Sequence, residues 1–205
     1  MIAAAPPRIA LFGGTFDPIH AGHLALARQA CNQLQLDRVI FVPSGTPPHR
    51  SEGPVASAQH RCAMVALAIA EEPSFELSDM EARRTGPSFT VDTVFEFSQA
   101  HPDAQLFFLL GDDCAAKLHR WKGIDDMLKR VTFVTAHRFG APPDASVAQR
   151  LLRVEMPAMP QASTHLRQRL ANGHDICSHT RPSVADYIAR ERLYQGTSPT
   201  DGVTT

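Results

Sequence analysis

Two histidines, His20 and His23, stand three positions apart in the stretch IALFGGTFDPIHAGHL. The stretch begins as an apolar strand and ends in a helical pattern, so the histidines fall where a strand passes into a helix. Side chains three positions apart share one face of a helix. The unpaired N–H groups and the dipole of a helix N-terminus favour anions. Two imidazole donors at that point therefore predict a phosphate site.

The residues before the histidines support the same interpretation. Gly13 and Gly14 carry no Cβ, so we expect them to let the backbone turn sharply and a ligand approach closely. Thr15 adds a hydroxyl and a backbone N–H. Two glycines alone are a weak signal, because the chain has neither a G-x-x-x-x-G-K-[ST] loop nor a G-x-G-x-x-G fingerprint. Zinc is the alternative ligand for a histidine pair, but no Cys or acidic residue stands at helical spacing beside it.

A second group of polar residues lies in STHLRQRLANG, near the C-terminus. Ser163 and Thr164 are natural N-cap residues, and Arg167 lies one turn further along the same helical face. Hydroxyls, N–H groups and a guanidinium then surround one point, which suits an anion. A capped helix with a surface arginine is the alternative.

Composition limits the classes of protein. The 205 residues are 43% hydrophobic and 20% charged, as in a globular protein, and the formal net charge of −1 creates no strong field toward DNA or an anionic membrane. No apolar run approaches the roughly 18 residues of a membrane span, and the N-terminus has no export signal. Four cysteines without a C-x-x-C pair predict buried thiols rather than disulfides. We expect a cytoplasmic protein with no nucleic acid or membrane partner.

Apolar runs alternate with helical patterns along the chain. The expected strands are 8–13, 38–43, 75–80, 105–111, 131–136 and 151–156, and the expected helices are 23–34, 58–72, 90–100, 113–121, 124–130, 163–173 and 183–194. The alternation predicts an α/β fold that is Rossmann-like and doubly wound, with a mainly parallel sheet and helices on both faces. In such folds ligands bind beyond the carboxyl ends of the strands, where the histidines are expected. We expect one domain over 1–195, its part from about 160 carrying the S-T-x-x-R helix, and a disordered tail over 196–205.

The stretch GGTFDPIHAGH resembles the signature of the nucleotidyltransferases that carry an H-x-G-H motif. Four later segments narrow the resemblance to the bacterial nicotinate-nucleotide adenylyltransferases: PSGTPPHR (43–50), RRTGPSFTVDT (83–93), GDDCAAKLHRW (111–121) and ASTHLRQRLANG (162–173). The resemblance runs from about Ile9 to Tyr194. Ala162, Leu166 and Phe89 depart from the residues usual in the family, and these departures are conservative.

The resemblance implies an enzyme that joins ATP and nicotinate mononucleotide to give deamido-NAD and pyrophosphate, with Mg²⁺ held mainly by phosphates and water. The implied catalytic residues are His20, His23 and Arg167. The implied ATP contacts are Gly13, Gly14, Thr15, His20, His23, Asp112, Ser163, Thr164 and Arg167. The implied contacts to the mononucleotide are His49, Arg50, Thr90, Trp121 and Arg138.

Some of these roles have alternatives. Asp112 would accept hydrogen bonds from the ribose and Asp113 would cap the next helix, although either carboxylate suits either task. Trp121, the only tryptophan, would stack on the pyridine ring or else pack in the core. His49 and Arg50 would face the mononucleotide or belong to an ordinary exposed loop.

Two other classes of protein share parts of this pattern. Relatives that use phosphopantetheine or transfer cytidylyl groups are typically shorter and lack the PPHR and SFT segments. A nucleotide-binding regulator without turnover, or an RNA-binding fragment, is disfavoured by the intact histidine and arginine motifs and by the net charge of −1. The sequence leaves monomer and homo-oligomer open.

Overall fold

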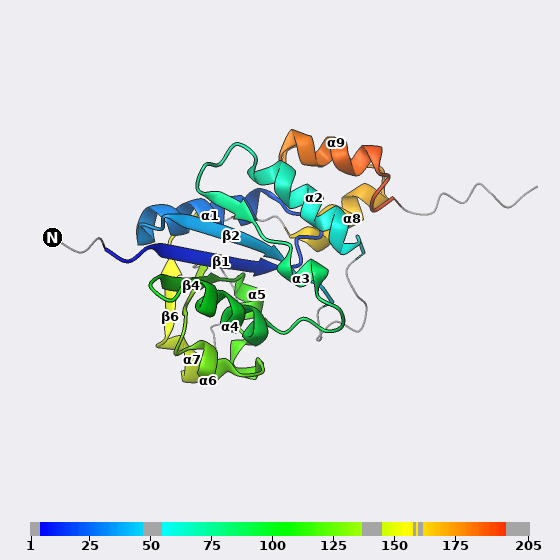
Figure 1. Cartoon of the computed structure of the whole chain (residues 1–205). Helices are drawn as coiled ribbons and strands as arrows, with labels where there is room; N and C mark the ends of the chain where they lie inside the picture. Colours follow the sequence, from blue (N-terminus) through cyan, green and yellow to red (C-terminus); the bar gives the residue numbers. More distant parts are fainter. Residues whose placement is uncertain (1–4, 47–54, 137–144, 158, 160–161, 196–205) are drawn as a thin grey trace, which may run out of the picture.

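One parallel sheet forms the centre of the molecule (Figure 1). The structure is a computed structural model that describes residues 5–46, 55–136, 145–157, 159 and 162–195, without the side chains of 112, 113 and 145. Its six strands run in the order β3-β2-β1-β4-β5-β6. They are β1 (Arg8–Gly14), β2 (Arg38–Pro43), β3 (Phe75–Leu77), β4 (Gln105–Leu109), β5 (Thr132–Ala136) and β6 (Leu151–Val154).

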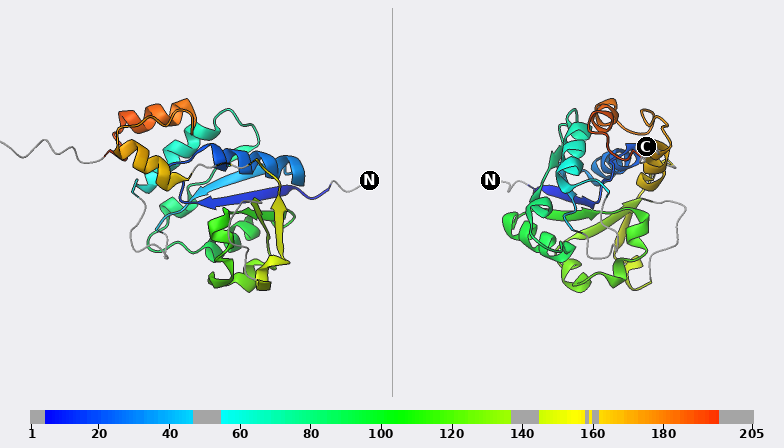
Figure 2. Two further views of the ribbon diagram at one scale, coloured as in Figure 1. Left: turned by 180° about the vertical axis from the view of Figure 1, so that it is seen from behind. Right: turned by 90° about the vertical axis from the view of Figure 1, so that its right-hand side faces the viewer.

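Helices cover both faces of the sheet (Figures 1 and 2). One face carries α1 (Ala21–Leu34), α2 (Ala58–Ile69), α8 (Ser163–Ala171) and α9 (Pro182–Arg190). The other carries α4 (Thr90–Ala100), α5 (Asp112–Ala115), the 3₁₀ turn η1 (Leu118–Arg120), α6 (Ile124–Met127) and α7 (Ala145–Ala148), while the short α3 (Met80–Arg83) follows β3. The predicted Rossmann-like α/β fold is confirmed, and every strand pair is parallel.

Both faces of the sheet are buried, which explains why the strands are continuous apolar runs. In β1, Ala10 and Phe12 pack into the core under α1, α2, α8 and α9. Ile9 and Leu11 point the opposite way, into the core under α4 to α7. The period of two along a strand therefore divides the apolar residues between two cores.

The strand order places a crevice beside β1. From β1 the chain moves outward to β2 and β3, then returns to β4 on the other side of β1. The connections that follow β1 and β4 therefore leave on opposite faces, and such a switch point is where open α/β sheets bind ligands. The loop of residues 15–20 and the junction at Gly111 both lie at this carboxyl edge.

The two glycines of the first motif do not make the expected turn. Gly13 and Gly14 are the last residues of β1. A Cβ on Gly13 would lie 2.6 Å from Cζ of Phe108, and one on Gly14 would lie 2.9 Å from Cζ of Phe16. Glycine is needed at both positions because aromatic rings occupy the space that a Cβ would take. The turn is made by Phe16, at φ 51°, followed by the cis peptide bond between Asp17 and Pro18.

Two smaller expectations also need correction. The helix predicted over 113–121 is divided into α5 and η1, and η1 ends at Trp121, which has an extended ψ of 136° and packs on the core. Cys31, Cys62 and Cys177 are thiols, as predicted, but burial was expected for every cysteine and Cys114 and Cys177 are exposed. Within the described segments, no helix is both long and apolar enough to cross a membrane.

The packing of β1 generates a stability prediction. Gly13→Ala should lower the free energy of unfolding by about 1–3 kcal/mol, because the added methyl group overlaps a ring that is held in the core. Gly111→Ala is the matched control, since a Cβ at Gly111 would meet no atom within 4 Å. Urea denaturation of both variants measures the difference, and equal stabilities would contradict the packing role of Gly13.

Candidate active site

The two histidines of the first motif lie together at the start of α1. His20 is the N-cap residue, and its ring stacks on that of His23 with the centroids 3.8 Å apart and the planes inclined by 24°. The backbone N–H of His20 donates to Nδ1 of His23 at 3.2 Å. An Nδ1 that accepts carries no proton, so neutral His23 carries its proton on Nε2. The predicted shared face is confirmed.

Two aromatic rings pack against the half-buried His23. The ring of Phe16 meets it edge-on at 5.0 Å between centroids, and that of Phe12 does so at 6.0 Å. His20 is only 5% exposed. In such an apolar surrounding a hydrogen bond to an anion is stronger than it would be in water.

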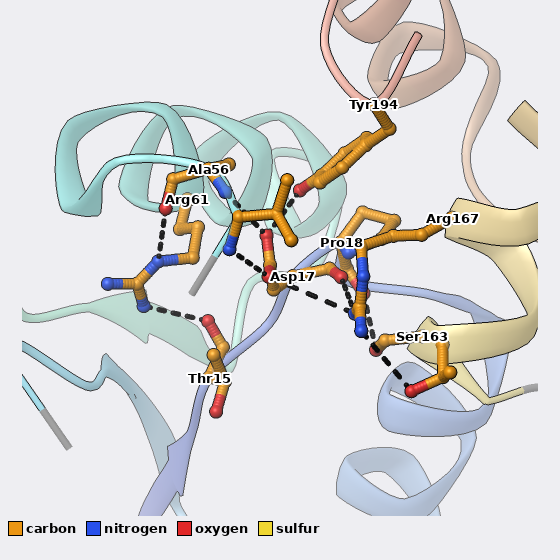
Figure 3. A network of polar contacts seen from close by, with 10 residues as sticks. Thr15, Asp17, Pro18, Ala56, Arg61, Ser163, Arg167 and Tyr194 are labelled. Atoms are coloured by element: carbon orange, nitrogen blue, oxygen red, sulfur yellow. Dashed lines mark hydrogen bonds and ion pairs between the residues drawn. The ribbon is translucent and has the colours of Figure 1, made fainter. Parts of the chain in front are cut away.

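The start of α8 is attached to the loop that carries these histidines (Figure 3). Nη1 of Arg167 donates to the carbonyl oxygen of Asp17 at 2.7 Å, and Oγ of Ser163 donates to that of Pro18 at 3.0 Å. Nη2 of Arg167 also donates to Oγ1 of Thr164 at 3.3 Å. The first and last motifs, about 145 positions apart, are therefore neighbours.

The expected capping role of Ser163 and Thr164 is wrong. Ala162 is the N-cap residue of α8, Ser163 is the first helical residue, and neither a hydroxyl nor an amide caps the helix. The hydroxyl of Ser163 binds the Pro18 carbonyl instead, so it holds two segments together rather than ending a helix. Thr164 is exposed and Arg167 is partly buried.

Asp17 was not singled out by the sequence, yet it organises this loop (Figure 3). Its side chain is 1% exposed, and its carboxylate accepts from the N–H groups of Val55 and Ala56 at 2.8 and 3.1 Å. The hydroxyl of Tyr194 donates to the same carboxylate at 2.7 Å, and Nη1 of Arg167 lies 3.8 Å from it. The only signal in the sequence was an acidic residue inside the passage from strand to helix.

Arg61 is the second functional candidate that the sequence did not reveal. Its side chain is 1% exposed, and it donates to the carbonyl oxygens of Thr15 at 2.8 Å, Ser44 at 2.6 Å and Ala56 at 3.2 Å. These carbonyls belong to three different loops at the carboxyl edge of the sheet. The sequence held one signal for Arg61. It lies three positions before the buried Met64, so a charged residue falls on the apolar face of the α2 helix.

Two residues predicted to contact the mononucleotide lie on segments that touch each other. Thr90 is the first residue of α4, preceded by Phe89, whose ring lies 4.4 Å from Nζ of Lys122. A Cβ on Gly123 would lie 2.7 Å from the Val91 side chain, so the segment that follows Trp121 packs closely on α4.

Trp121 is half-buried rather than enclosed. Its ring meets those of Phe108 and Phe133 at right angles, with centroids 6.2 and 6.4 Å apart. The side chain therefore packs against the core and is also partly accessible. This arrangement is compatible with both expected roles, stacking on the pyridine ring and packing in the core.

Several predicted residues lie outside the described part of the chain. They are His49, Arg50 and Arg138. The backbones of Asp112 and Asp113 open α5 directly after Gly111, but their side chains are not described, so the choice between them stays a prediction. Among the residues with described side chains, no group of three or more His, Cys, Asp or Glu is arranged to hold a metal ion.

The sheet order and the polar residues at its switch point define an α/β protein of the nucleotide-binding class. Residues 11–169 match the model of the cytidylyltransferase-like family. Among solved structures, the Plasmodium falciparum nicotinic acid mononucleotide adenylyltransferase complexed with NaAD is similar, with a TM-score of 0.76 at 22% identity over 92% of this chain and 97% of that one. This likeness supports the fold.

Curated relatives narrow the class. The probable nicotinate-nucleotide adenylyltransferase of Clostridium tetani is 36% identical over 196 residues, which cover 91% of this chain and 98% of the relative. That of Halalkalibacterium halodurans is 41% identical over 189 residues, covering 92% and 91%. The chain belongs to the nicotinate-nucleotide adenylyltransferase family. The resemblance inferred from the motifs is confirmed.

The contact between Tyr194 and Asp17 generates a prediction on pH. Burial and the bond to Asp17 raise the pKa of Tyr194 above its ordinary value near 10. The neutral phenol therefore contributes its full stability below about pH 10, and loses it as the pH rises toward the raised pKa. Tyr194→Phe should lower the free energy of unfolding by about 1.5–3 kcal/mol at pH 7, as for a hydrogen bond to a charged group.

Urea denaturation from pH 7 to 10.5 measures this effect. The gap in free energy of unfolding between wild type and Tyr194→Phe should narrow above about pH 10, since only the wild type loses the contribution of this phenol. Tyr187→Phe is the control, because Tyr187 is the only other tyrosine and its hydroxyl contacts Nδ1 of His60 on α2. A gap that stays constant, or an equally large gap at pH 7 for Tyr187→Phe, would refute the role of Asp17 as the partner.

Proposed function

We propose that this protein joins ATP and nicotinate mononucleotide to give deamido-NAD and pyrophosphate, a step of NAD biosynthesis. The observation that carries the proposal is the stacked pair of His20 and His23 at the start of α1, with Arg167 bonded to the same loop. Relatives at 36–41% identity over nearly the whole chain bear the name of this activity.

The reaction needs alignment more than a protein nucleophile. The phosphate of the mononucleotide is ionised at neutral pH and attacks the α-phosphorus of ATP directly, so the protein has to orient both substrates and stabilise charge. Negative charge grows on the α-phosphate oxygens and on the departing pyrophosphate. His20 and Nε2–H of His23 donate to those oxygens, and the α1 dipole adds to the field.

Arg167 and the residues around it suit the β- and γ-phosphates. A guanidinium has five N–H donors, and within the described structure it directs one to Asp17 and one to Thr164. Its other donors suit phosphate oxygens. The hydroxyl of Thr164 and the N–H groups of the first turn of α8 are donors of the same type. We assign Gly13, Gly14, Thr15 and Ser163 to the wall of this subsite and Asp112 to the ribose.

The start of α4 is proposed to bind the carboxylate of nicotinate. The N–H groups of Thr90 and Val91 belong to the first helical turn and have no partner within the helix. Trp121, on the segment packed against this turn, supplies a ring for the pyridine. His49, Arg50 and Arg138 complete the proposed contacts to the mononucleotide.

Mg²⁺ is proposed to accompany ATP and to supply charge neutralisation at the phosphates. Mg²⁺ prefers oxygen ligands and keeps several waters. The buried carboxylate of Asp17 accepts from Val55, Ala56 and Tyr194, so it belongs to the scaffold rather than to a metal cage. The donor chemistry therefore fits a cation held by phosphates and water.

Pyrophosphate release with ATP and a panel of acceptors tests the function. Nicotinate mononucleotide should exceed nicotinamide mononucleotide by at least about tenfold in kcat/KM, because an amide NH₂ facing N–H donors leaves polar groups unpaired, at a cost of about 1–3 kcal/mol. Phosphopantetheine should give no product. Absence of turnover with nicotinate mononucleotide would refute the function, and equal use of both mononucleotides would refute the carboxylate site.

Loss of one histidine donor should slow the chemical step. His23→Ala should lower kcat by about 10²–10³-fold, as for loss of one oxyanion donor, and change KM for ATP far less. Steady-state kinetics measures this. His101→Ala is the control, because His101 caps the end of α4 against Phe97, away from the carboxyl edge. Near-normal turnover by His23→Ala, or radiolabelled AMP trapped on either histidine of the motif, would contradict the role as a donor.

Trp121 should contribute to the binding of one substrate only, the mononucleotide. Trp121→Ala should raise KM for the mononucleotide and leave KM for ATP nearly unchanged, since stacking on a ligand base is worth about 1–3 kcal/mol. Trp121→Phe keeps an aromatic ring against Phe108 and Phe133 and should recover part of the loss. Circular dichroism shows whether each variant is folded. An equal rise in both KM values would assign Trp121 to the core alone.

A further inference from the structure

Two buried side chains of opposite charge hold one peptide group, that of Gly45. Nη2 of Arg61 donates to the carbonyl oxygen of Gly45 at 3.3 Å, and the backbone N–H of Gly45 is near enough to the carboxylate of Glu81 to favour its ionised form. Arg61 is 1% exposed and Glu81 is 7% exposed. Burial raises the pKa of Glu81, which is consistent with a carboxylate withdrawn from water.

The contact around Gly45 is as tight as a backbone allows. A Cβ at this position would lie 2.3 Å from the carbonyl oxygen of Glu81 and 2.6 Å from Oγ of Ser88. The next residue, Thr46, accepts from the N–H of Ser88 at 3.0 Å. Gly45 and Thr46 are therefore fixed against the segment that begins α4, immediately before the PPHR loop in the sequence.

The same guanidinium also holds the loop of the histidines. Nη1 of Arg61 donates to the carbonyl oxygen of Thr15 at 2.8 Å, just before Phe16 with its positive φ of 51°. Nη2 donates to that of Ser44 at 2.6 Å. A guanidinium is planar and rigid, so the carbonyls that it binds have a fixed separation.

A contact of Glu81 extends this link to α4. Oγ1 of Thr93 donates to the Glu81 carboxylate at 2.7 Å, and Nη1 of Arg84 donates to the same hydroxyl at 3.1 Å. Thr93 lies one turn after Thr90, whose N–H is assigned above to the nicotinate carboxylate. Arg61 and Glu81 thus connect the loop assigned to ATP with two of the segments assigned to the mononucleotide, the one that begins at Gly45 and the start of α4.

We propose that Arg61 is a positioning residue that sets the separation of the two substrates, with Glu81 as its counterpart at Gly45. The inference rests on the proposed function. In-line attack requires the reacting atoms to lie about 3–3.5 Å apart, and a misplacement of 1 Å can cost about 10²-fold in rate. Arg61 touches neither substrate in this account. It acts through the carbonyl groups of the two loops.

Arg61→Lys tests the proposal, because an ammonium keeps the charge but cannot bind these carbonyls in a fixed fork. We expect kcat to fall by about 30–100-fold and both KM values to stay within about threefold. Each loop still forms, but the distance between the two loops is no longer fixed. Arg8→Lys is the matched control. Arg8 also donates to a backbone carbonyl, that of Leu34, but lies at the opposite edge of the sheet.

Kinetics are measured at a temperature where circular dichroism shows every variant to be folded. A merely structural Arg61 would lower the melting temperature and leave kcat at that temperature unchanged, which would overturn the proposal. A rise in KM for one substrate with kcat retained would overturn it too. Loss of turnover by the wild type itself would refute the proposed function and the inference together.

Glu81→Gln provides a second variant should Arg61→Lys not fold. The amide keeps the shape and one acceptor oxygen but removes the charge, so kcat should fall by about 3–10-fold with KM again little changed. Wild-type kcat in a folded Glu81→Gln, or a lowered kcat in Arg8→Lys, would contradict a positioning role specific to this link.

Discussion

The buried carboxylate of Asp17 is the constraint on which the rest of the site depends. A charge that is 1% exposed is stable only when hydrogen bonds replace its water. Its partners come from the segment just before α2, from Tyr194 near the end of the described chain and from Arg167 on α8. The loop that carries His20 and His23 therefore gains its shape only when distant parts of the chain have assembled around it.

This requirement explains why the turn after β1 tolerates an unfavourable conformation. Phe16 has a positive φ of 51°, which costs a residue with a large side chain of the order of 1–3 kcal/mol. Burial of its ring against Phe12 and Phe41, and the bonds to the neighbouring Thr15 and Asp17, offset that cost. The conformation in turn directs the chain into α1 so that His20 caps the helix and stacks on His23.

The sequence predicted the sheet and the histidine pair because both follow from local pattern. Continuous apolar runs identify strands buried on two faces, and a spacing of three places two rings on one helical face. It did not predict the packing roles of Gly13 and Gly14, which depend on Phe108 and on the turn at Phe16. Nor did it reveal Asp17 and Arg61, whose partners lie up to 177 positions away. The continuous helix expected over 113–121 was wrong, and local pattern did not show that the chain turns to an extended conformation at Trp121, whose ring packs on the core.

Two arginines, the buried Arg61 and the partly buried Arg167, bind the loops of the candidate site through backbone carbonyls. Arg167 holds the carbonyl of Asp17, and Arg61 holds those of Thr15 and Ser44. A carbonyl oxygen is present whatever the side chain, so these bonds constrain where the loops run and not which side chains they present. Side chains on the loops can then be devoted to substrates. A substitution that alters substrate preference need not disturb the scaffold, whereas loss of either guanidinium leaves buried carbonyls unpaired and displaces whole loops. Under the proposed function, recognition and alignment of the substrates are thus carried by different atoms of the same loop residues.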